Sequence, residues 1–157
     1  MKKAFTMIEL IFVIVILGIL AAVALPKFIG VAGQAHEANL KSFVGTLNRS
    51  VGPTLWSKSI SEGKHGSINY LDLEYDSSKT DNNLTTYVDV PKEIKDVKIK
   101  NLTTTGFKVV AKADSAVAGG DYYIACEDGN ASQAPVCHTY KGSKNLGDNA
   151  DSTQQID

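Results

Sequence analysis

The sequence predicts an α+β protein in which one long N-terminal helix packs on a small antiparallel β-sheet. Residues 10–26 carry no charge, and apolar residues at helical spacing then continue as far as Leu55. The last part of the chain instead holds short segments rich in β-branched residues, separated by Gly, Asn and Asp. A helix with one apolar stripe must bury it, and a sheet face is the natural partner in so short a chain.

Length and charge restrict the classes of protein to which the chain can belong. Its 157 residues suit a single domain. Beyond Gly30 there are 13 basic and 16 acidic residues, so this part is weakly acidic, whereas a nucleic-acid domain would be basic. The lysines between residues 92 and 112 alternate with apolar and acidic residues and are expected to form a solvated face of strands. Their alternative role as a DNA-binding patch is disfavoured, and nucleic acid is an unlikely partner on these grounds.

The N-terminus begins with Lys2 and Lys3, followed by an apolar run of about 21 residues from Phe5. At 1.5 Å per residue this run spans a membrane as a helix. A secretory signal peptide is the alternative, because Ala22-Val23-Ala24 matches a signal-peptidase site. Three observations argue against a signal peptide. The apolar run is long enough for a full membrane span, and Glu9 interrupts its start. Cleavage after Ala24 would also make Pro26 the second residue of the mature chain, which is a poor context for signal peptidase.

Glu9 is the only ionisable residue within this apolar run. A charged side chain near the centre of a bilayer costs about 2.5–3.5 kcal/mol on insertion scales. We therefore expect Glu9 to have a partner.

Residues 2–10, KKAFTMIEL, resemble the processing site of type IV pilins and type II secretion pseudopilins. The resemblance implies a pilin-like fold and a prepilin peptidase that cuts between Ala4 and Phe5 and methylates the new amine of Phe5. Residues 1–4 would then be the leader. The residue before the cut is usually glycine, and this chain has Ala4. Pro26 matches the helix-kinking proline of these proteins, although a helix end at Pro26 is an equal alternative.

In a filament of such subunits, the amine of Phe5 on one copy can meet Glu9 of a neighbour. A charge pair at low dielectric is strongly penalised when one member is removed, so it also sets the register between subunits. The alternative is that Glu9 sits hydrated at the interface. The partners implied are copies of the chain, other pilin-like subunits, the peptidase, an inner-membrane assembly platform and membrane lipid.

The helix is expected in two parts, a transmembrane and assembly part over residues 5–26 and an amphipathic part over residues 27–58. One side of the second part carries polar residues, including Glu37, Asn48 and Arg49. Trp56 is expected to anchor the end of the helix against the sheet. The opposite side forms the apolar stripe: Leu40, Phe43, Val44, Leu47, Val51 and Leu55.

The rest of the chain is expected to contain a connecting loop over residues 59–84, an antiparallel sheet over residues 85–141 and a polar, acidic, mobile tail over residues 142–157. Alternation and β-branched content predict five strands in the sheet. They are Thr85–Val90, Val97–Leu102, Phe107–Ala113, Tyr122–Glu127 and Val136–Tyr140.

Cys126 and Cys137 are the only cysteines of the chain. Two thiols this close can form half of a metal site, a redox pair or a disulfide. No C-x-x-C spacing and no second Cys/His pair is present, which removes the usual zinc patterns. With an export segment at the N-terminus, the pair predicts a structural disulfide, and two buried free thiols are the alternative.

The sequence contains no nucleophile elbow, P-loop, dinucleotide motif or zinc spacing, so we expect neither an enzyme nor a cofactor. The three histidines are expected to have ordinary surface roles. Asp148 and Asp151, in a run of oxygen ligands, are candidates for a calcium site like that of major pseudopilins. That run lacks the spacing and closing glutamate of an EF-hand, and a solvated tail is the favoured reading.

Two tracts fit the extended bacterial N-glycosylation pattern Asp/Glu-x-Asn-x-Ser/Thr. Asn83 stands in DNNLT, and Asn130 stands in DGNAS. Both fall in predicted loops of an exported part of the chain, where an acceptor must lie.

The sequence therefore predicts a non-enzymatic subunit of a type IV pilus-like or type II secretion filament. It would be a single-pass inner-membrane protein with a periplasmic soluble part before assembly, and part of a periplasmic or cell-surface filament afterwards. The rival hypothesis is a membrane-tethered periplasmic binding module that never polymerises.

Overall fold

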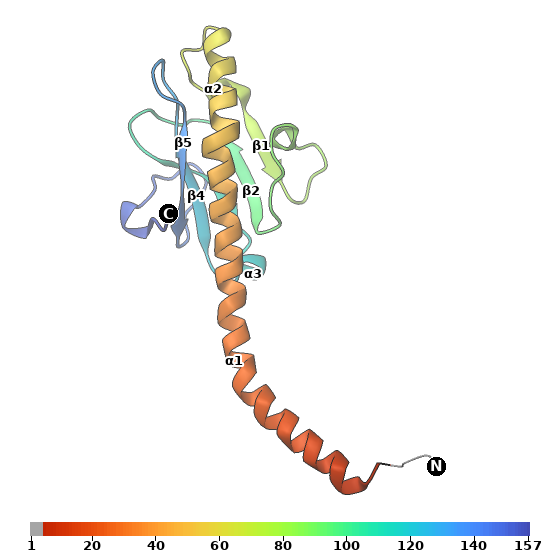
Figure 1. Ribbon diagram of the computed structural model, residues 1–157. Coiled ribbons are helices and arrows are strands. Elements are labelled where there is room, and N and C mark those ends of the chain that lie inside the picture. The colour runs from red at the N-terminus through yellow and green to blue at the C-terminus, as the bar shows by residue number, and fades with distance from the viewer. Residues whose placement is uncertain (1–4) are drawn as a thin grey trace. The chain divides into compact units, whose positions relative to one another are not determined.

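The computed structural model describes residues 5–157, so Ala4, on the leader side of the predicted cut, lies outside the described residues. The chain divides into two compact units, residues 5–35 and His36–Asp157. Helix α1 (Met7–Thr46) begins in the first unit and ends in the second (Figure 1). Pro26 lies inside α1, so the alternative reading of Pro26 as the end of the helix is wrong.

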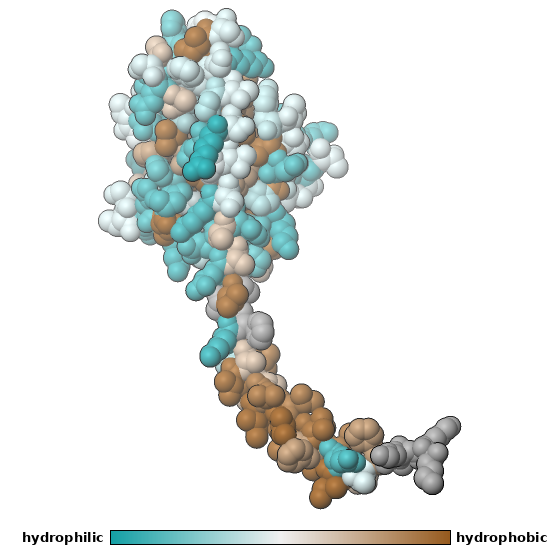
Figure 2. All heavy atoms as spheres, viewed as in Figure 1, coloured by the Kyte–Doolittle hydropathy of each residue, from teal (hydrophilic) through white to brown (hydrophobic). Residues whose placement is uncertain are grey.

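The first unit is an apolar helix whose side chains are exposed in the single chain. From Met7 to Lys27 it is long and apolar enough, by length and composition, to cross a membrane. Figure 2 shows the hydrophobic residues gathered on this part of α1. Leu10, Phe12 and Leu17 are each more than half exposed, so something outside the chain must cover them in the cell.

Helix α1 continues as the π-helix η1 (Leu47–Val51) and helix α2 (Gly52–Ser61). Pro53 has no backbone N–H, so the regular i→i−4 series of hydrogen bonds is interrupted there. The preceding turn widens, and the N–H of Gly52 donates to the carbonyl of Leu47, five residues back. The single long helix was predicted; this π-turn was not.

The second unit contains a five-stranded antiparallel sheet in the order β1-β2-β3-β4-β5, which confirms the predicted α+β fold. Consecutive strands pair throughout, as expected for short connections. The strands are β1 (Leu73–Asp76), β2 (Ile94–Ile99), β3 (Lys108–Ala113), β4 (Tyr122–Glu127) and β5 (Val136–Lys141).

The helix runs along one face of this sheet (Figure 1). Its apolar stripe packs on that face, as predicted. Leu40 and Leu55 are each only 1% exposed. They form one core with the strand residues Ile94, Val97 and Ile124. Each fully buried side chain of this size contributes about 1.5–3 kcal/mol to stability, so this contact is the main support of the unit.

The opposite face of the sheet is covered by the C-terminal residues, which corrects the expected mobile tail. Tyr123 and Tyr140 stack there with ring centroids 4.9 Å apart, and Leu146 and Ala150 pack against their cluster. The N–H of Ala150 donates to the carbonyl of Phe107 at 2.9 Å. The tail is polar by composition, but its few apolar residues cover apolar rings that the sheet would otherwise expose.

The first predicted strand, Thr85–Val90, is wrong, because residues 83–86 form the 3₁₀-helix η3 (Asn83–Thr86). Strand β1 lies instead inside the predicted connecting loop. The side chain of Leu84 is fully buried and holds η3 against the core. Strand β2 begins three residues before its predicted start, because a register shift between Ile94 and Asp96 breaks the alternation of buried and exposed residues.

Short helical elements complete the second unit. They are η2 (Asn69–Leu71), α3 (Ser115–Ala118) and η4 (Ser152–Gln154).

Candidate functional site

The start of α1 is built by a reciprocal pair of hydrogen bonds between Thr6 and Glu9. The carboxylate oxygen Oε2 of Glu9 accepts from both the backbone N–H and the hydroxyl of Thr6, each at 2.9 Å. The N–H of Glu9 donates to the hydroxyl oxygen of Thr6 at 3.3 Å. This is a capping box, and its T-x-x-E signature in TMIE was a local signal that our sequence reasoning missed.

Phe5 lies immediately before this cap and is 84% exposed. Together with Ile8, Phe12 and Val13 it lines a shallow apolar hollow around Glu9. Both bonds from Thr6 end on Oε2 of Glu9, and Oε1 accepts no hydrogen bond within residues 5–157. Glu9 can therefore accept a further donor, such as an amine, without breaking the cap.

Gly18 lies in the middle of the apolar helix, where glycine costs about 1 kcal/mol relative to alanine. A Cβ at this position would meet no atom within 4 Å. Nothing in the described part of the chain therefore requires a glycine here. Small residues on apolar helices allow a second helix to approach closely, so Gly18 points to a contact outside the chain.

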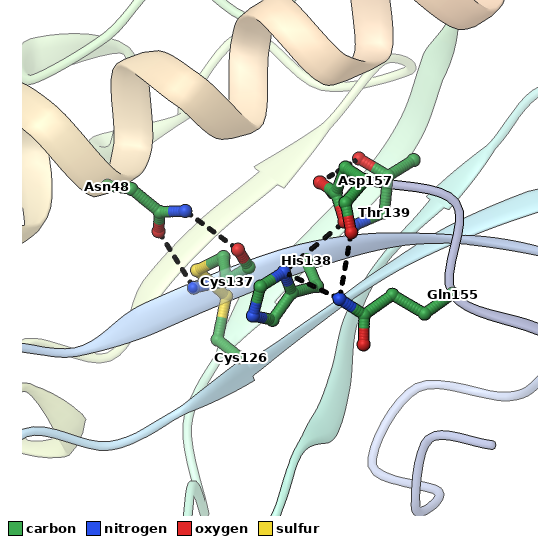
Figure 3. A network of polar contacts seen from close by, with 7 residues as sticks. All are labelled: Asn48, Cys126, Cys137, His138, Thr139, Gln155 and Asp157. Carbon is green, nitrogen blue, oxygen red and sulfur yellow. Dashed lines mark hydrogen bonds and ion pairs between the residues drawn. A yellow bond between two sulfur atoms is a disulfide. The ribbon is translucent and has the colours of Figure 1, made fainter. Parts of the chain in front are cut away.

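Cys126 and Cys137 form the predicted disulfide and are opposite each other on strands β4 and β5. Figure 3 shows the side chain of Asn48 reaching the backbone of Cys137. The amide of Asn48 donates to the carbonyl of Cys137 and accepts from its N–H, both at 2.7 Å. Asn48 was expected on the solvent side; it lies in the π-turn, which a uniform 3.6-residue period does not describe.

The end of the tail binds Thr139, the next residue of β5 whose backbone N–H and carbonyl point away from β4 (Figure 3). Its N–H and hydroxyl donate to the carboxylate of Asp157 at 3.0 Å, and its carbonyl accepts from the N–H of Ile156. Asn48 and the tail therefore occupy the backbone groups on the free edge of β5. This protects that edge from pairing with the strands of other molecules.

Glu93 is a buried carboxylate, although it is one of the acidic residues among the lysines of residues 92–112, for which a solvated strand face was expected. It is 1% exposed and accepts hydrogen bonds from Asn39 at 3.0 Å and from His36 at 2.9 Å, both on α1. Burial raises the pKa of Glu93, but the bonds from Asn39 and His36 outweigh it, so the pKa lies below its ordinary value of 4.5. This contact explains why His36 is not an ordinary surface histidine.

The two calcium candidates are used within turns of the tail. Asp148 accepts from the N–H of Asn145 at 3.0 Å, and Asp151 caps η4 by accepting from Thr153. Bonds from the Thr153 side chain and backbone lower the pKa of Asp151. Among residues 5–157, no group of three or more His, Cys, Asp or Glu side chains is placed to hold a metal ion.

The glycosylation candidates occupy two different settings. Asn83 opens η3 beside the outer edge of β1, and Asn130 lies in the loop between β4 and β5. The carbonyl of Asn130 accepts from the indole N–H of Trp56 at 2.7 Å. Trp56 therefore anchors the helix end on this loop.

The second unit also has an open groove between α1 and the segment that precedes β2. Its volume is about 560 Å³, and Asn39, Phe43, Tyr87 and Val90 are among its lining residues. A second open hollow of the same volume lies beside Lys41, Gly45 and Arg49.

Comparison with known proteins bears on the N-terminal segment. Residues 1–25 match the family model described as a prokaryotic N-terminal methylation motif. Over 38 residues the chain is 55% identical to the type IV narrow pilus major component PilA5 of Thermus thermophilus. This similarity covers 24% of the chain and 33% of that relative. No solved structure matches the chain.

Proposed function

We propose that this chain, whose residues 1–25 match the prokaryotic N-terminal methylation motif, is a structural subunit of a pilus-like filament and not an enzyme. The observation that carries the proposal is the combination of the methylation motif with an apolar helix left uncovered by the rest of the described chain. Membrane anchoring by this helix before assembly, and burial against other subunits afterwards, would both cover it.

The chemistry of assembly would reside at Phe5 and Glu9. Cleavage between Ala4 and Phe5 creates an amine directly before the capped start of α1. Methylation would keep this amine charged and reduce its hydration. Oxygen Oε1 of Glu9, which accepts no bond within the described chain, would receive the amine of a neighbouring subunit. Because an unpaired charge is costly in an apolar environment, the pair would also fix how far neighbouring helices are shifted.

The second unit would lie outside the cytoplasm, in the periplasm before assembly and on the filament afterwards. The disulfide between Cys126 and Cys137 supports this, since disulfides persist in oxidising compartments. The prepilin peptidase, an inner-membrane assembly platform and membrane lipid are the partners that this route requires. A type II secretion filament would use the same N-terminal chemistry.

The rival function is a membrane-tethered binding module that stays monomeric. The groove near Tyr87 is the observation in its favour, because a small ligand binds in a concave surface. The groove is open, however, and the rival leaves Gly18 and the methylation motif without a role.

Cross-linking between copies distinguishes the two functions. Two tagged subunits are expressed together, one with Phe5→Cys and one with Ile8→Cys, so that a bond between the new cysteines must join different chains. Both native cysteines are already paired. We expect cross-linked dimers for this pair and none when Ile8→Cys is replaced by Leu17→Cys, which lies nine residues further along the helix.

Two outcomes would contradict the proposal. Persistent monomer in the Phe5 and Ile8 pair would favour the tethered binding module. A mature chain that retains residues 1–4 by intact mass would show that the predicted cut between Ala4 and Phe5 does not occur.

A further inference from the structure

The open groove beside α1 contains a single charged side chain. Residues from Asn39 to Thr46, about two turns of α1, form one wall of the groove, and residues 87–91 form the other. The ring of Tyr87 on the second wall is 36% exposed. Among the residues that line the groove, only Asp89 is charged. The groove therefore combines an uncovered aromatic ring with one negative charge.

Asp89 has no cation to neutralise it within its own chain. It is exposed, and its carboxylate forms no ion pair among the described residues 5–157. Glu37 and Glu74, by contrast, are each paired with a lysine. An unpaired carboxylate among apolar groups favours a partner that brings both a cation and apolar surface.

The helix α1 carries a surface with this complementary pattern. Lys27 is the only charged residue between Glu9 and His36. Val23 and Val31 lie four residues before and after it, so the three side chains share one face of the helix, the Lys27 face. The two valines are 63% and 60% exposed, and Lys27 is exposed as well. The Lys27 face thus presents one cation between two uncovered apolar side chains.

Charge distinguishes this groove from the second hollow of the unit. That hollow has the same volume and lies beside Lys41, Gly45 and Arg49. Its cations have the same sign as Lys27, so a Lys27 face docked there would bring like charges together. Asp89 gives the first groove the opposite sign. Charge complementarity therefore matches the Lys27 face to the groove that contains Asp89.

We propose that this groove receives the Lys27 face of a second copy of the chain. Lys27 pairs with Asp89, and the two valines of the Lys27 face cover the ring of Tyr87. The inference rests on the proposed function, in which other subunits bury α1, and it adds a surface of the second unit to that interface. A subunit in a filament has several neighbours, so this copy is not required to be the one whose amine meets Glu9.

Charge reversal tests the pair. Asp89→Lys places two cations in the contact and should lower the yield of sheared filaments at least about tenfold at equal membrane levels of the protein. Lys27→Glu should lower the yield in the same way, and the double variant Lys27→Glu/Asp89→Lys should recover most of it. Asp81→Lys is the matched control, because it makes the same change at an exposed carboxylate outside the groove. It should assemble as the wild type does, and urea midpoints check that each variant is folded.

Cross-linking locates the contact without any charge reversal. Two tagged subunits are expressed together, one with Lys27→Cys and one with Asp89→Cys, and are treated with a short bis-maleimide linker. A product that carries both tags must join different chains, and both native cysteines are already paired. We expect this product, and none when Asp89→Cys is replaced by Ser50→Cys, which lies in the second hollow.

The outcomes separate this inference from the proposed function. Subunits that form the cross-link between Phe5 and Ile8 but none between Lys27 and Asp89 overturn the docking alone, and leave the groove to a lipid or a small ligand. An unchanged yield of Asp89→Lys, or a double variant no better than its single variants, also overturns the pair. So does an equal loss in Asp81→Lys, which would show an effect of net charge. Absence of both cross-links overturns the proposed function together with this inference.

Discussion

At the scale of single residues, Glu9 has two roles that use different atoms. Its Oε2 accepts hydrogen bonds from Thr6 of the same chain and so caps the start of α1. Its Oε1 remains available to a donor from another chain. A charged residue in an apolar helix is thus locally satisfied in the monomer and would become an intersubunit contact in the filament. The two roles can be separated by substitution.

Glu9→Ala should leave folding and export intact and abolish assembly. Breaking a buried charge pair costs about 3–5 kcal/mol, which corresponds to at least a hundredfold loss of subunit incorporation. The measurement is the yield of sheared filaments at equal membrane levels of the protein.

Thr6→Ala is the matched control for Glu9→Ala. It removes the helix cap, at a cost of about 1 kcal/mol, but keeps the carboxylate. We expect Thr6→Ala to assemble. Loss of filaments in Thr6→Ala as severe as in Glu9→Ala would mean that the cap, and not an intersubunit pair, explains the requirement for Glu9.

At the scale of elements, the second unit is held together by polar bonds as well as by the apolar stripe of the helix. Glu93, just before β2, joins the sheet to α1 through His36 and Asn39. Asn48 joins η1 to the edge of β5 at Cys137. Both contacts use side chains that form two bonds, so they set the position of the helix along the sheet, which apolar packing alone specifies weakly.

Glu93→Gln should flatten the acid dependence of stability. Because the pKa of Glu93 is lowered in the folded state, the unfolded chain binds its proton more tightly. The stabilisation is therefore fully present above the ordinary value of 4.5 and is lost as the pH falls from there through the lowered pKa. Urea unfolding of both proteins at pH 7 and at lower pH measures this.

Glu93→Gln should also lower the free energy of unfolding at pH 7 by about 1.5–3 kcal/mol, because its bonds involve a charged group. Glu74→Gln is the control. The pKa of Glu74 is also lowered, by a bond from Lys98, but the pair is exposed and screened, so a smaller change is expected. If Glu93→Gln lost as much stability in acid as the wild-type protein does, Glu93 would not be a source of the acid dependence.

At the scale of the whole molecule, the described chain joins a helix whose apolar side chains are uncovered to a part that folds on itself. The apolar residues of α1 up to Lys27 are exposed, whereas those of the second unit form two clusters on opposite faces of the sheet. The disulfide and the tail both bind the edge strand β5 to the rest of the second unit. We therefore expect that loss of the disulfide lowers the stability of the whole second unit, which unfolds in one cooperative transition.

Replacing both Cys126 and Cys137 by alanine should lower the free energy of unfolding by about 3 kcal/mol, from the entropy of closing a short loop. The measurement is the urea midpoint of the oxidised protein with and without reductant. The double variant serves as the control, since its midpoint should not respond to reductant. An oxidised wild-type protein whose midpoint equals that of the double variant would show that the disulfide does not stabilise the unit.

Features with a short-range physical signal were predictable from the residues. The apolar helix, its stripe from Leu40 to Leu55, strand β4 and the pairing of the two cysteines follow from local periodicity and spacing. The capping box was predictable by the same means, although TMIE was not recognised as one. The roles of Phe5 and Glu9 came from a motif and remain predictions of chemistry between chains.

Features that depend on distant residues were not predictable. The local sequence places Glu93 on a solvated face of strands, whereas in the fold α1 brings His36 and Asn39 against it. The helical period of 3.6 residues places Asn48 on the solvent side. In the fold, the π-turn instead places its side chain against the backbone of Cys137. Local pattern measures what a residue prefers, whereas burial and hydrogen-bond partners depend on which segments the tertiary fold brings together.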